Sequence, residues 1–491
     1  MTERDNGYFR KNDILKELEI GALSSDGSGI AKIDGYPVFI KDTLPGDVVS
    51  IKIIKVKKDL AFGKLISVEK NSPDRVLPKC DKARPCGGCT LQEFAYEKQL
   101  AYKDDKVYNC LLRIGGIPAK ILDTAREEPV GMENPWRYRN KAQYPIGTDR
   151  NGRIVSGFFA GRTHSIIEAK ECWLNPSEFS SILRTFLGFC EENRLKPYDE
   201  KSGNGNIRHL VIRKAFGTGE IMAMPVIKSL KHFGKDLKEA LREALVGIPG
   251  LTTIVLNENP EKTNVILGRK TEIIYGPGFI MDQMNGLKFK ISPHSFYQIN
   301  SLQAERVYKK AIEYAKLTGN EKVYDLCCGT GTISLFVAKA LEASGAWVSG
   351  IDIVPEAIDD AKYNARINNI SNVDFIAAAV EELLPKIRDI SADAVILDPP
   401  RAGMERPALD AIVKASPSRI VYISCDPATL ARDIKVFLAS GYHLSRFVTI
   451  DQFCQTSHVE TVALLINQNE KAKHHVRVGI DAEEYYSKRN K

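Results

Sequence analysis

Short apolar runs separated by turn-forming residues occupy residues 13–70. Val- and Ile-rich stretches such as VVSIKIIKVKK alternate with DG, DGY and PGD sequences. This pattern is typical of β-strands joined by tight turns and predicts a small, OB-like β-barrel. Its lysines predict a basic face, and barrels of this kind often bind single-stranded or looped RNA. A solvated lysine face on a barrel without a ligand accounts for the same lysines equally well.

The pattern becomes mixed between residues 73 and 290. Residues 90–115 have the spacing of a helix, and the rest alternates between strands and loops. The stretch NPWRYRNKAQYPIG interleaves Arg and Lys with Trp and Tyr. This composition suits stacking on bases and contact with phosphates, although an ordinary amphipathic strand pair also has it. We therefore expect a mixed α+β central domain that contacts RNA.

From residue 291, strand-like and helix-like segments alternate. The strand-like segments KVYDL, WVSGIDI, DAVILDPP and RIVYISC are separated by helix-like segments such as TISLFVAKALEA and PEAIDDAKYNARIN. This order predicts a doubly wound α/β sheet, the Rossmann-like arrangement. We expect domains over residues 1–72, 73–290 and 291–470, followed by a charged tail, 471–491.

Composition narrows the class of protein. The chain has 491 residues, 43% hydrophobic and 27% charged, as in soluble globular proteins. No apolar run approaches the roughly 18 residues of a membrane span. The N-terminus mixes charges and lacks an apolar core, so we expect no signal peptide and a cytoplasmic protein. The net charge of +7 is compatible with nucleic acid without being evidence for it. Nothing indicates an obligate protein partner.

A glycine-rich turn lies in VYDLCCGTGTISL, between a predicted strand and a predicted helix. Gly329 and Gly331 permit a tight turn and close approach of the backbone to a ligand. Asp352 ends the next predicted strand, where a carboxylate can bind ribose hydroxyls. The third glycine of the dinucleotide fingerprint is absent, because Ile333 and Ser334 occupy that region. This favours S-adenosylmethionine (SAM) over NAD, with a turn that binds no ligand as the alternative.

Two later strands end in residues that can carry chemistry. Asp398, in VILDPPRAG, is expected at the carboxyl edge of the sheet, where open α/β folds bind ligands. Cys425 ends the next strand before a helix start, whose dipole we expect to lower the pKa of the thiol. Glu460 begins another strand 35 residues later. Adjacent strands would bring thiol and carboxylate together, and chemistry at an unactivated aromatic carbon needs such a nucleophile and base. A rigid turn and a buried cysteine are the alternatives.

Three of the ten cysteines form a C-x5-C-x2-C pattern. In a cytoplasmic chain of this length we do not expect a disulfide framework. A metal site needs a fourth ligand, for which Cys172 is the candidate. In ligand number, three close thiolates and one distant one suit a [4Fe–4S] cluster and a zinc ion equally well. The proposed ligands are Cys80, Cys86, Cys89 and Cys172.

Five motifs together resemble the RNA uracil-5-methyltransferase family over about residues 13–470: ISCDPATLARD, DPPRAG, DLCCGTGTIS, SPHSFYQIN and DQFCQTSHVETV. The larger members, which methylate 23S ribosomal RNA, match best. The resemblance implies a TRAM barrel, a central domain and a C-terminal SAM-dependent methyltransferase domain. It also implies that the four cysteines hold a [4Fe–4S] cluster, with zinc less favoured.

The resemblance further implies roles for single residues. Cys425 is expected to attack C6 of uracil, and Glu460 to remove the proton from C5. Gln298, Cys327 and Asp352 match positions that bind SAM; an aromatic residue is common where this chain has Cys327. Asp398 is expected to hold the uracil edge or the cofactor.

The expected function is C5-methylation of uridine in 23S rRNA. The same chemistry on the T-loop uridine of tRNA ranks lower, because the tRNA enzymes of the family generally lack the barrel and the cysteine cluster. A non-catalytic RNA-binding or ribosome-assembly factor is the alternative from another class. The presence of both Cys425 and Glu460 argues against it.

Overall fold

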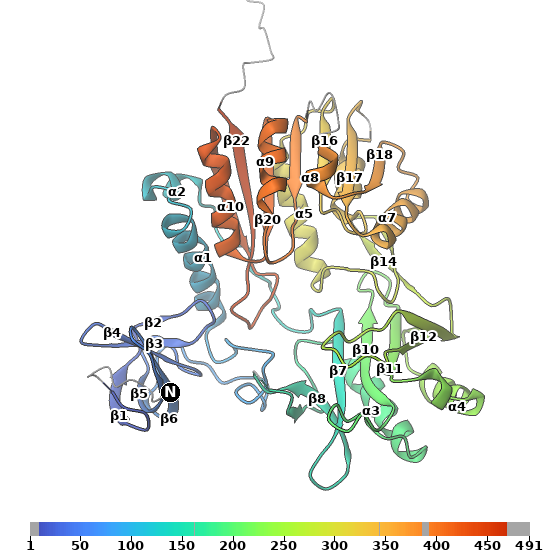
Figure 1. Ribbon diagram of the computed structural model, residues 1–491. Helices are drawn as coiled ribbons and strands as arrows, with labels where there is room; N and C mark the ends of the chain where they lie inside the picture. The colour runs from blue at the N-terminus through green and yellow to red at the C-terminus, as the bar shows by residue number, and fades with distance from the viewer. Residues whose placement is uncertain (1–8, 162, 343, 385–391, 469–491) are drawn as a thin grey trace, which may run out of the picture.

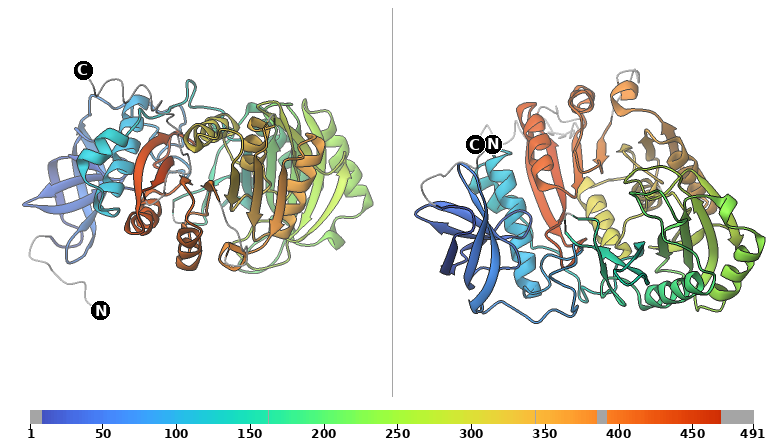
Figure 2. Two further views of the ribbon diagram at one scale, coloured as in Figure 1. Left: turned by 90° about the horizontal axis from the view of Figure 1, so that it is seen from above. Right: turned by 60° about the horizontal axis from the view of Figure 1, so that its bottom comes forward.

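Three large β-sheets organise the protein. The computed structural model describes residues 9–161, 163–342, 344–384 and 392–468; the predicted charged tail lies outside these ranges. The N-terminal sheet and the central sheet lie apart, on either side of helix α1 and the last strands of the C-terminal sheet (Figures 1 and 2). Among the helices of the described ranges, none is both long and apolar enough to cross a membrane.

The N-terminal sheet has six strands in the order β1-β5-β6-β4-β3-β2. Along β5 the side chains of Val49, Ile51 and Ile53 are buried, whereas Lys52 and Lys55 are exposed. This alternation produces the apolar core and the basic face that the sequence predicts. The strands are β1 (Ile14–Glu19), β2 (Ala22–Leu23), β3 (Gly29–Ile33), β4 (Tyr36–Ile40), β5 (Val48–Val56) and β6 (Ala61–Lys70).

Two helices, α1 (Tyr96–Arg113) and α2 (Ala119–Ala125), follow this sheet. Their buried residues, such as Val107 and Leu122, belong to the same apolar core as the C-terminal sheet. The chain then forms bridges to the last strands of that sheet, including one from Val130 to Ile450. Residues in the predicted central domain therefore pack within the core of the C-terminal sheet, because the apolar faces of these helices find their partners there.

The central sheet has the order β13-β12-β11-β10-β7-β8-β9, and two helices cover one of its faces. The opposite face of β7 and β10 borders a cavity. The elements are β7 (Lys141–Thr148), β8 (Ile154–Phe159), β9 (Ile166–Glu168), α3 (Ser177–Glu192), β10 (Ile207–Lys214), β11 (Ile221–Ile227), the 3-10 helix η1 (Leu230–His232), α4 (Lys235–Val246), β12 (Leu251–Glu258) and β13 (Lys270–Tyr275).

The C-terminal sheet has the order β18-β17-β16-β19-β20-β22-β21. All its strands are parallel except β22, which lies antiparallel between β20 and β21. Helices α5, α6 and α7 pack in a core on one face, and α1, α2, α8, α9 and α10 in a core on the other. This confirms the predicted doubly wound fold.

The strands of the C-terminal part are β14 (Ile280–Met284), β15 (Leu287–Ile291), β16 (Lys322–Leu326), β17 (Trp347–Asp352), β18 (Val373–Ala377), β19 (Ala394–Leu397), β20 (Arg419–Ser424), β21 (Tyr442–Ile450) and β22 (Glu460–Asn467). Its helices are α5 (Ser301–Ala315), α6 (Thr332–Ala340), α7 (Pro355–Ile367), α8 (Val380–Leu383), α9 (Arg406–Ala415) and α10 (Pro427–Ala439). The carboxyl edge of its parallel strands borders the same cavity as the central sheet.

Candidate active site

One cavity of about 1720 Å³ lies between the central sheet and the carboxyl edge of the C-terminal sheet. Every site residue predicted from the sequence lines it except Gly331, which directly precedes helix α6. The lining residues among them are Cys80, Cys86, Cys89, Cys172, Gln298, Cys327, Gly329, Asp352, Asp398, Cys425 and Glu460. The fold thus joins residues separated by up to 380 positions in the chain.

The register of two strands brings Cys425 and Glu460 together. Ser424, the last residue of β20, pairs with Thr461 on the antiparallel strand β22. The next residues along, Cys425 and Glu460, therefore lie across from each other. Glu460 is only 3% exposed, and its Oε1 atom has no hydrogen-bond partner among the described residues. A buried, unpaired carboxyl oxygen is costly, so an arrangement that retains one is typical of a functional site.

The surroundings of Cys425 favour the protonated form of its thiol in the free protein. Burial, and next the charge of Glu460, raise the pKa of Cys425 to about 11, against the opposing charge of Arg401. The expectation that helix α10 lowers this pKa is therefore wrong for the free protein. The side chain of Asp426 accepts hydrogen bonds from the backbone N–H groups of Ala428 and Thr429 at 2.9 and 3.1 Å. Asp426 thereby caps the end of the helix that faces the thiol. Desolvation, the largest contribution, raises the pKa of the thiol.

Two buried carboxyl groups, those of Asp398 and Glu460, lie next to each other in the cavity lining. Burial raises the pKa of Asp398 to about 7, although a hydrogen bond with Gln298 opposes this. Burial, and next the charge of Asp398, raise the pKa of Glu460 well above its usual range. Two close carboxyl groups in an apolar setting tend to hold one proton between them. Arg401 is the cation that acts on Glu460; sequence reasoning missed it, although it directly follows the Asp-Pro-Pro stretch.

The glycine turn is tied to the predicted ribose-binding acid. Asp352 accepts hydrogen bonds from the backbone N–H groups of Gly329 at 2.8 Å and Val354 at 2.9 Å. Gly331 has a φ of +77°, and a Cβ atom there would lie 2.7 Å from the ring of Phe375, so only glycine fits. A Cβ at Gly329 would meet nothing within 4 Å, which leaves space above the turn for a ligand.

Cys327 lines the cavity with an unusual backbone conformation. It has a left-handed backbone, with a φ of +65°, and its Sγ atom lies 4.0 Å from the Sδ atom of Met404. Asp325 lies two residues before Cys327, and sequence reasoning did not single it out. It accepts a hydrogen bond from Ser334 Oγ at 2.5 Å. Burial raises the pKa of Asp325 to about 7. Its place at the end of β16, just before the glycine turn, was the signal that could have identified it.

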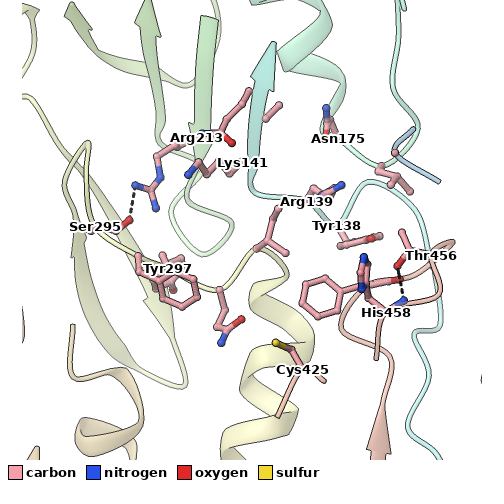
Figure 3. Close-up of a pocket in the computed structure, with 18 of the residues that line it drawn as sticks. Tyr138, Arg139, Lys141, Asn175, Arg213, Ser295, Tyr297, Cys425, Thr456 and His458 are labelled. Atoms are coloured by element: carbon pink, nitrogen blue, oxygen red, sulfur yellow. Dashed lines mark hydrogen bonds between the residues drawn. The ribbon is translucent and has the colours of Figure 1, made fainter. Parts of the chain in front are cut away.

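The loop between β21 and β22 is held from outside the C-terminal sheet. Lys103 of α1 forms a fully buried ion pair with Asp451, with 2.5 Å between Nζ and Oδ1. His458 of this loop lies beside Cys425 in the cavity, and Figure 3 shows both side chains. Burial lowers the pKa of His458 to about 4, so its ring is neutral. The loop that leads into Glu460 is therefore positioned by helix α1, which sequence reasoning did not anticipate.

The four predicted metal-binding cysteines lie in one region of the cavity lining. Cys89 and Cys172 pack in the same small apolar cluster, and Cys86 Sγ accepts a hydrogen bond from the backbone N–H of Gly88 at 3.4 Å. Burial raises the pKa of Cys89 to about 12. Within the described ranges, no three or more His, Cys, Asp or Glu side chains are arranged to hold a metal ion. Electrostatic contacts link Cys80 with Cys86, and Cys86 and Cys89 with Cys172, so the fold brings the four thiols near one another.

The doubly wound sheet, the glycine turn and the acid that ends the next strand are features of nucleotide-binding α/β folds, to which SAM-dependent methyltransferases belong. A family model described as tRNA (Uracil-5-)-methyltransferase matches residues 256–468, and a TRAM domain model matches residues 16–66. The chain is 42% identical over 465 residues to an uncharacterized RNA methyltransferase of Clostridium tetani, covering 94% of this chain and 98% of that protein. The chain belongs to the RNA uracil-5-methyltransferase family.

Two further comparisons agree with this assignment. An uncharacterized RNA methyltransferase of Halalkalibacterium halodurans is 42% identical over 463 residues, which cover 94% of this chain and 98% of the relative. The crystal structure of Pyrococcus abyssi tRNA (uracil-54, C5)-methyltransferase in complex with S-adenosyl-L-homocysteine superposes with a TM-score of 0.73. The match has 28% identity and covers 92% of this chain and 99% of that chain. The protein is therefore a SAM-dependent RNA methyltransferase with an N-terminal TRAM domain.

Proposed function

We propose that this protein methylates C5 of a uridine in RNA through a transient covalent bond between Cys425 and C6 of the uracil ring. The observation that carries the proposal is the register of β20 and β22, which sets the thiol across from a buried carboxyl group at one cavity. C5 of uracil is too electron-poor to take a methyl group directly. A nucleophile at C6 and a base near C5 remove this barrier.

The Cys425 thiol loses its proton to solvent through the cavity, to which it is partly exposed. The thiolate sulfur then attacks C6, and the electron pair of the C5–C6 double bond moves to form an enolate at C4. Bound SAM supplies an electrophilic methyl group on a positively charged sulfur, and that charge favours the ionised forms of nearby carboxyl groups. C5 would take this methyl group while the bond between the methyl carbon and the sulfonium sulfur breaks, and the electron pair of that bond would stay on the sulfur of the departing S-adenosylhomocysteine.

Glu460 then removes the proton from C5, the C5–C6 double bond re-forms and the bond to Cys425 sulfur breaks. Asp398 lies beside Glu460. From this position we propose that it accepts or donates a hydrogen bond at the uracil edge. For Gln298, Gly329 and Asp352 we propose contacts to SAM. A base in folded RNA must leave its stack to enter such a cavity.

Of the two RNA classes, we infer that 23S rRNA is the substrate, on the resemblance to the larger family members. The alternative is tRNA, and one comparison favours it. The Pyrococcus abyssi enzyme, named for a tRNA uridine, matches 92% of this chain. The whole span of residues 14–70, which contains the N-terminal strands, is longer than the remaining 8% of the chain, so the match includes part of this span. The presence of the barrel therefore does not argue against tRNA.

Incubation with labelled SAM and unmodified transcripts of 23S rRNA and of tRNA tests this inference. We expect label in 23S rRNA, located by mass spectrometry as 5-methyluridine at a defined position. Label only in the T-loop of tRNA would contradict the rRNA inference and leave the chemistry intact. A folded protein that binds SAM and methylates neither RNA would contradict both.

We propose that Cys80, Cys86, Cys89 and Cys172 hold a [4Fe–4S] cluster. The donor set fits such a group: four thiols line one part of the cavity, and a backbone N–H already points at the sulfur of Cys86. Hydrogen bonds to sulfur are typical around such clusters. Four thiolates also suit zinc. When bound, either group would cross-link the residue 80–89 loop to the region of Cys172.

Metal analysis of protein purified without oxygen tests the cluster. We expect about four iron and four sulfide per chain, the composition of one cubane cluster. The Cys86→Ser variant should lose most of this iron because it removes one ligand. Cys110→Ser is the matched control, since Cys110 lies on α1 outside the cavity lining. One zinc per chain without iron, or iron that persists in Cys86→Ser, would contradict the proposal.

A further inference from the structure

Two positive side chains lie directly opposite each other on the wall of the cavity formed by the central sheet. Lys141 of β7 pairs in register with Arg213 of the antiparallel strand β10. Both line the cavity, and Figure 3 shows them side by side. Like charges at directly opposite positions destabilise a sheet. Within the described ranges, neither forms an ion pair with a carboxylate.

The two cations have different surroundings. Arg213 is only 3% exposed and donates hydrogen bonds to the backbone carbonyls of Ser292 and Ser295 at 2.9 and 2.8 Å. It therefore fastens the loop that leads to Gln298. The ammonium group of Lys141 has no hydrogen-bond partner in the part of the chain that the structure describes, and burial lowers its pKa to about 8. A partly buried cation without a partner is stabilised when an anion binds.

A third cation extends this wall toward the catalytic loop. Arg139 precedes Lys141 by two residues and also lines the cavity. Its Nε atom is buried and has no hydrogen-bond partner among the described residues. Arg139 lies within electrostatic range of His458 on one side and of Cys172 on the other. The unpaired donors of Lys141 and Arg139 thus lie along the cavity wall, between the β7–β10 pair and the neighbourhood of Cys425.

Most of the carboxyl groups that line the cavity come from the C-terminal part of the chain, which also contributes Arg401. The C-terminal sheet contributes the carboxyl groups of Asp352, Asp398 and Glu460, whereas Lys141 and Arg139 face it from the central sheet. The proposed SAM contacts lie on the carboxylate side. A uridine that reaches Cys425 brings its own negatively charged backbone, which must lie away from those carboxylates. Lysine and arginine are the usual partners of backbone phosphates, which position a nucleic acid without reading its sequence.

We propose that Lys141 and Arg139 form a phosphate-binding site for the RNA backbone beside the uridine that enters the cavity. Arg213 positions this site through the loop that it fastens. The inference rests on the proposed uridine methylation and adds the contact that holds the strand while the base is extruded. The alternative ligand for the same cations is the carboxylate group of SAM.

Binding of a short single-stranded RNA with one uridine tests the site at pH 7 without SAM. In a set of such RNAs, each backbone phosphate is replaced in turn by an uncharged methylphosphonate. In the wild-type protein, we expect one replacement next to the uridine to weaken binding about tenfold, the order expected for a hydrogen bond to a charged group. The same replacement should cost nothing further in Lys141→Met, because the partner charge is already gone. This variant should also reduce the slope of log affinity against log salt by about one.

Matched variants separate the outcomes. Lys322→Met, an exposed lysine at the start of β16 on the opposite edge of the sheet, should change neither the slope nor the response to methylphosphonates. Arg139→Gln should show its own coupled phosphate and serves as the second test if Lys141→Met does not fold. Equal methylphosphonate effects in wild type and both variants would overturn the proposal. So would a tenfold loss of SAM affinity in Lys141→Met with unchanged RNA binding, which would assign the cation to the cofactor carboxylate. Failure of the proposed methylation would appear separately, as wild-type protein that binds RNA without modifying it.

Discussion

Replacing Cys425 with alanine will abolish methyl transfer to RNA, with a fall in turnover of at least about 10³-fold, the order of loss seen when a covalent nucleophile is removed. The physical reason is that C5 of uracil becomes nucleophilic only after the sulfur adds to C6. The measurement is the initial rate of label transfer from SAM to RNA. Affinity for SAM and for RNA should change little, because the thiol is small, unbridged and partly exposed.

A matched control for this variant is Cys110→Ala. Cys110 is also partly exposed but lies on α1, outside the cavity, so its loss should leave the rate unchanged. Turnover that persists in folded Cys425→Ala protein would refute the covalent route while leaving the family assignment in place. The serine variant adds a further check, since a hydroxyl group of the same shape is a much weaker nucleophile than a thiolate and should also be inactive.

Replacing Glu460 with glutamine will stop the reaction after the methyl group has moved. The amide cannot take the C5 proton, so the thioether bond between Cys425 and C6 should persist. We expect turnover to fall by about 10²–10⁴-fold, as for other lost general bases. The trapped species should appear as a protein–RNA band of reduced mobility on a denaturing gel, with label from SAM in that band.

Two control variants show whether the trapped band depends on Cys425 and on the loss of Glu460. The double variant Cys425→Ala, Glu460→Gln should form no such band, because the sulfur that makes the bond is absent. Glu192→Gln, an exposed residue at the end of α3, should behave as wild type. Rapid turnover of Glu460→Gln without any trapped band would show that another group removes the proton. Asp398, whose pKa burial raises to about 7, would then be the first residue to examine.

The doubly wound fold could be predicted because strand-like and helix-like segments of the right length alternate along the last third of the chain. Gly329, Asp352 and Asp398 could be placed at one edge for the same reason, since parallel strands present their carboxyl ends together. The placement of α1 and α2 could not be predicted. Their sequence shows an apolar stripe, but a stripe does not say which sheet will cover it.

The pKa of Cys425 shows most clearly what the sequence could not predict. A helix start after a cysteine indicates a lowered pKa, yet the structure partly buries the thiol, sets Glu460 beside it and caps the helix with Asp426. The direction of a pKa shift depends on the sum of burial and all nearby charges, which residues distant in the sequence supply. The sequence predicts phosphate contacts for the stretch that contains Arg139 and Lys141. It could not show that their donors lack partners among the described residues, because burial and pairing are properties of the folded chain.

The sequence by itself determined the family, the order of the strands and helices in the C-terminal domain and the chemical groups available, since these depend on local spacing and on residue type. Only the tertiary structure decided that the antiparallel strand β22 returns beside β20, so that Glu460 meets Cys425. It also set the cations of the central sheet against the carboxyl groups of the C-terminal sheet across one cavity. Such pairings are decided by which apolar faces bury each other when the whole chain is compact, and no local stretch of sequence contains that information.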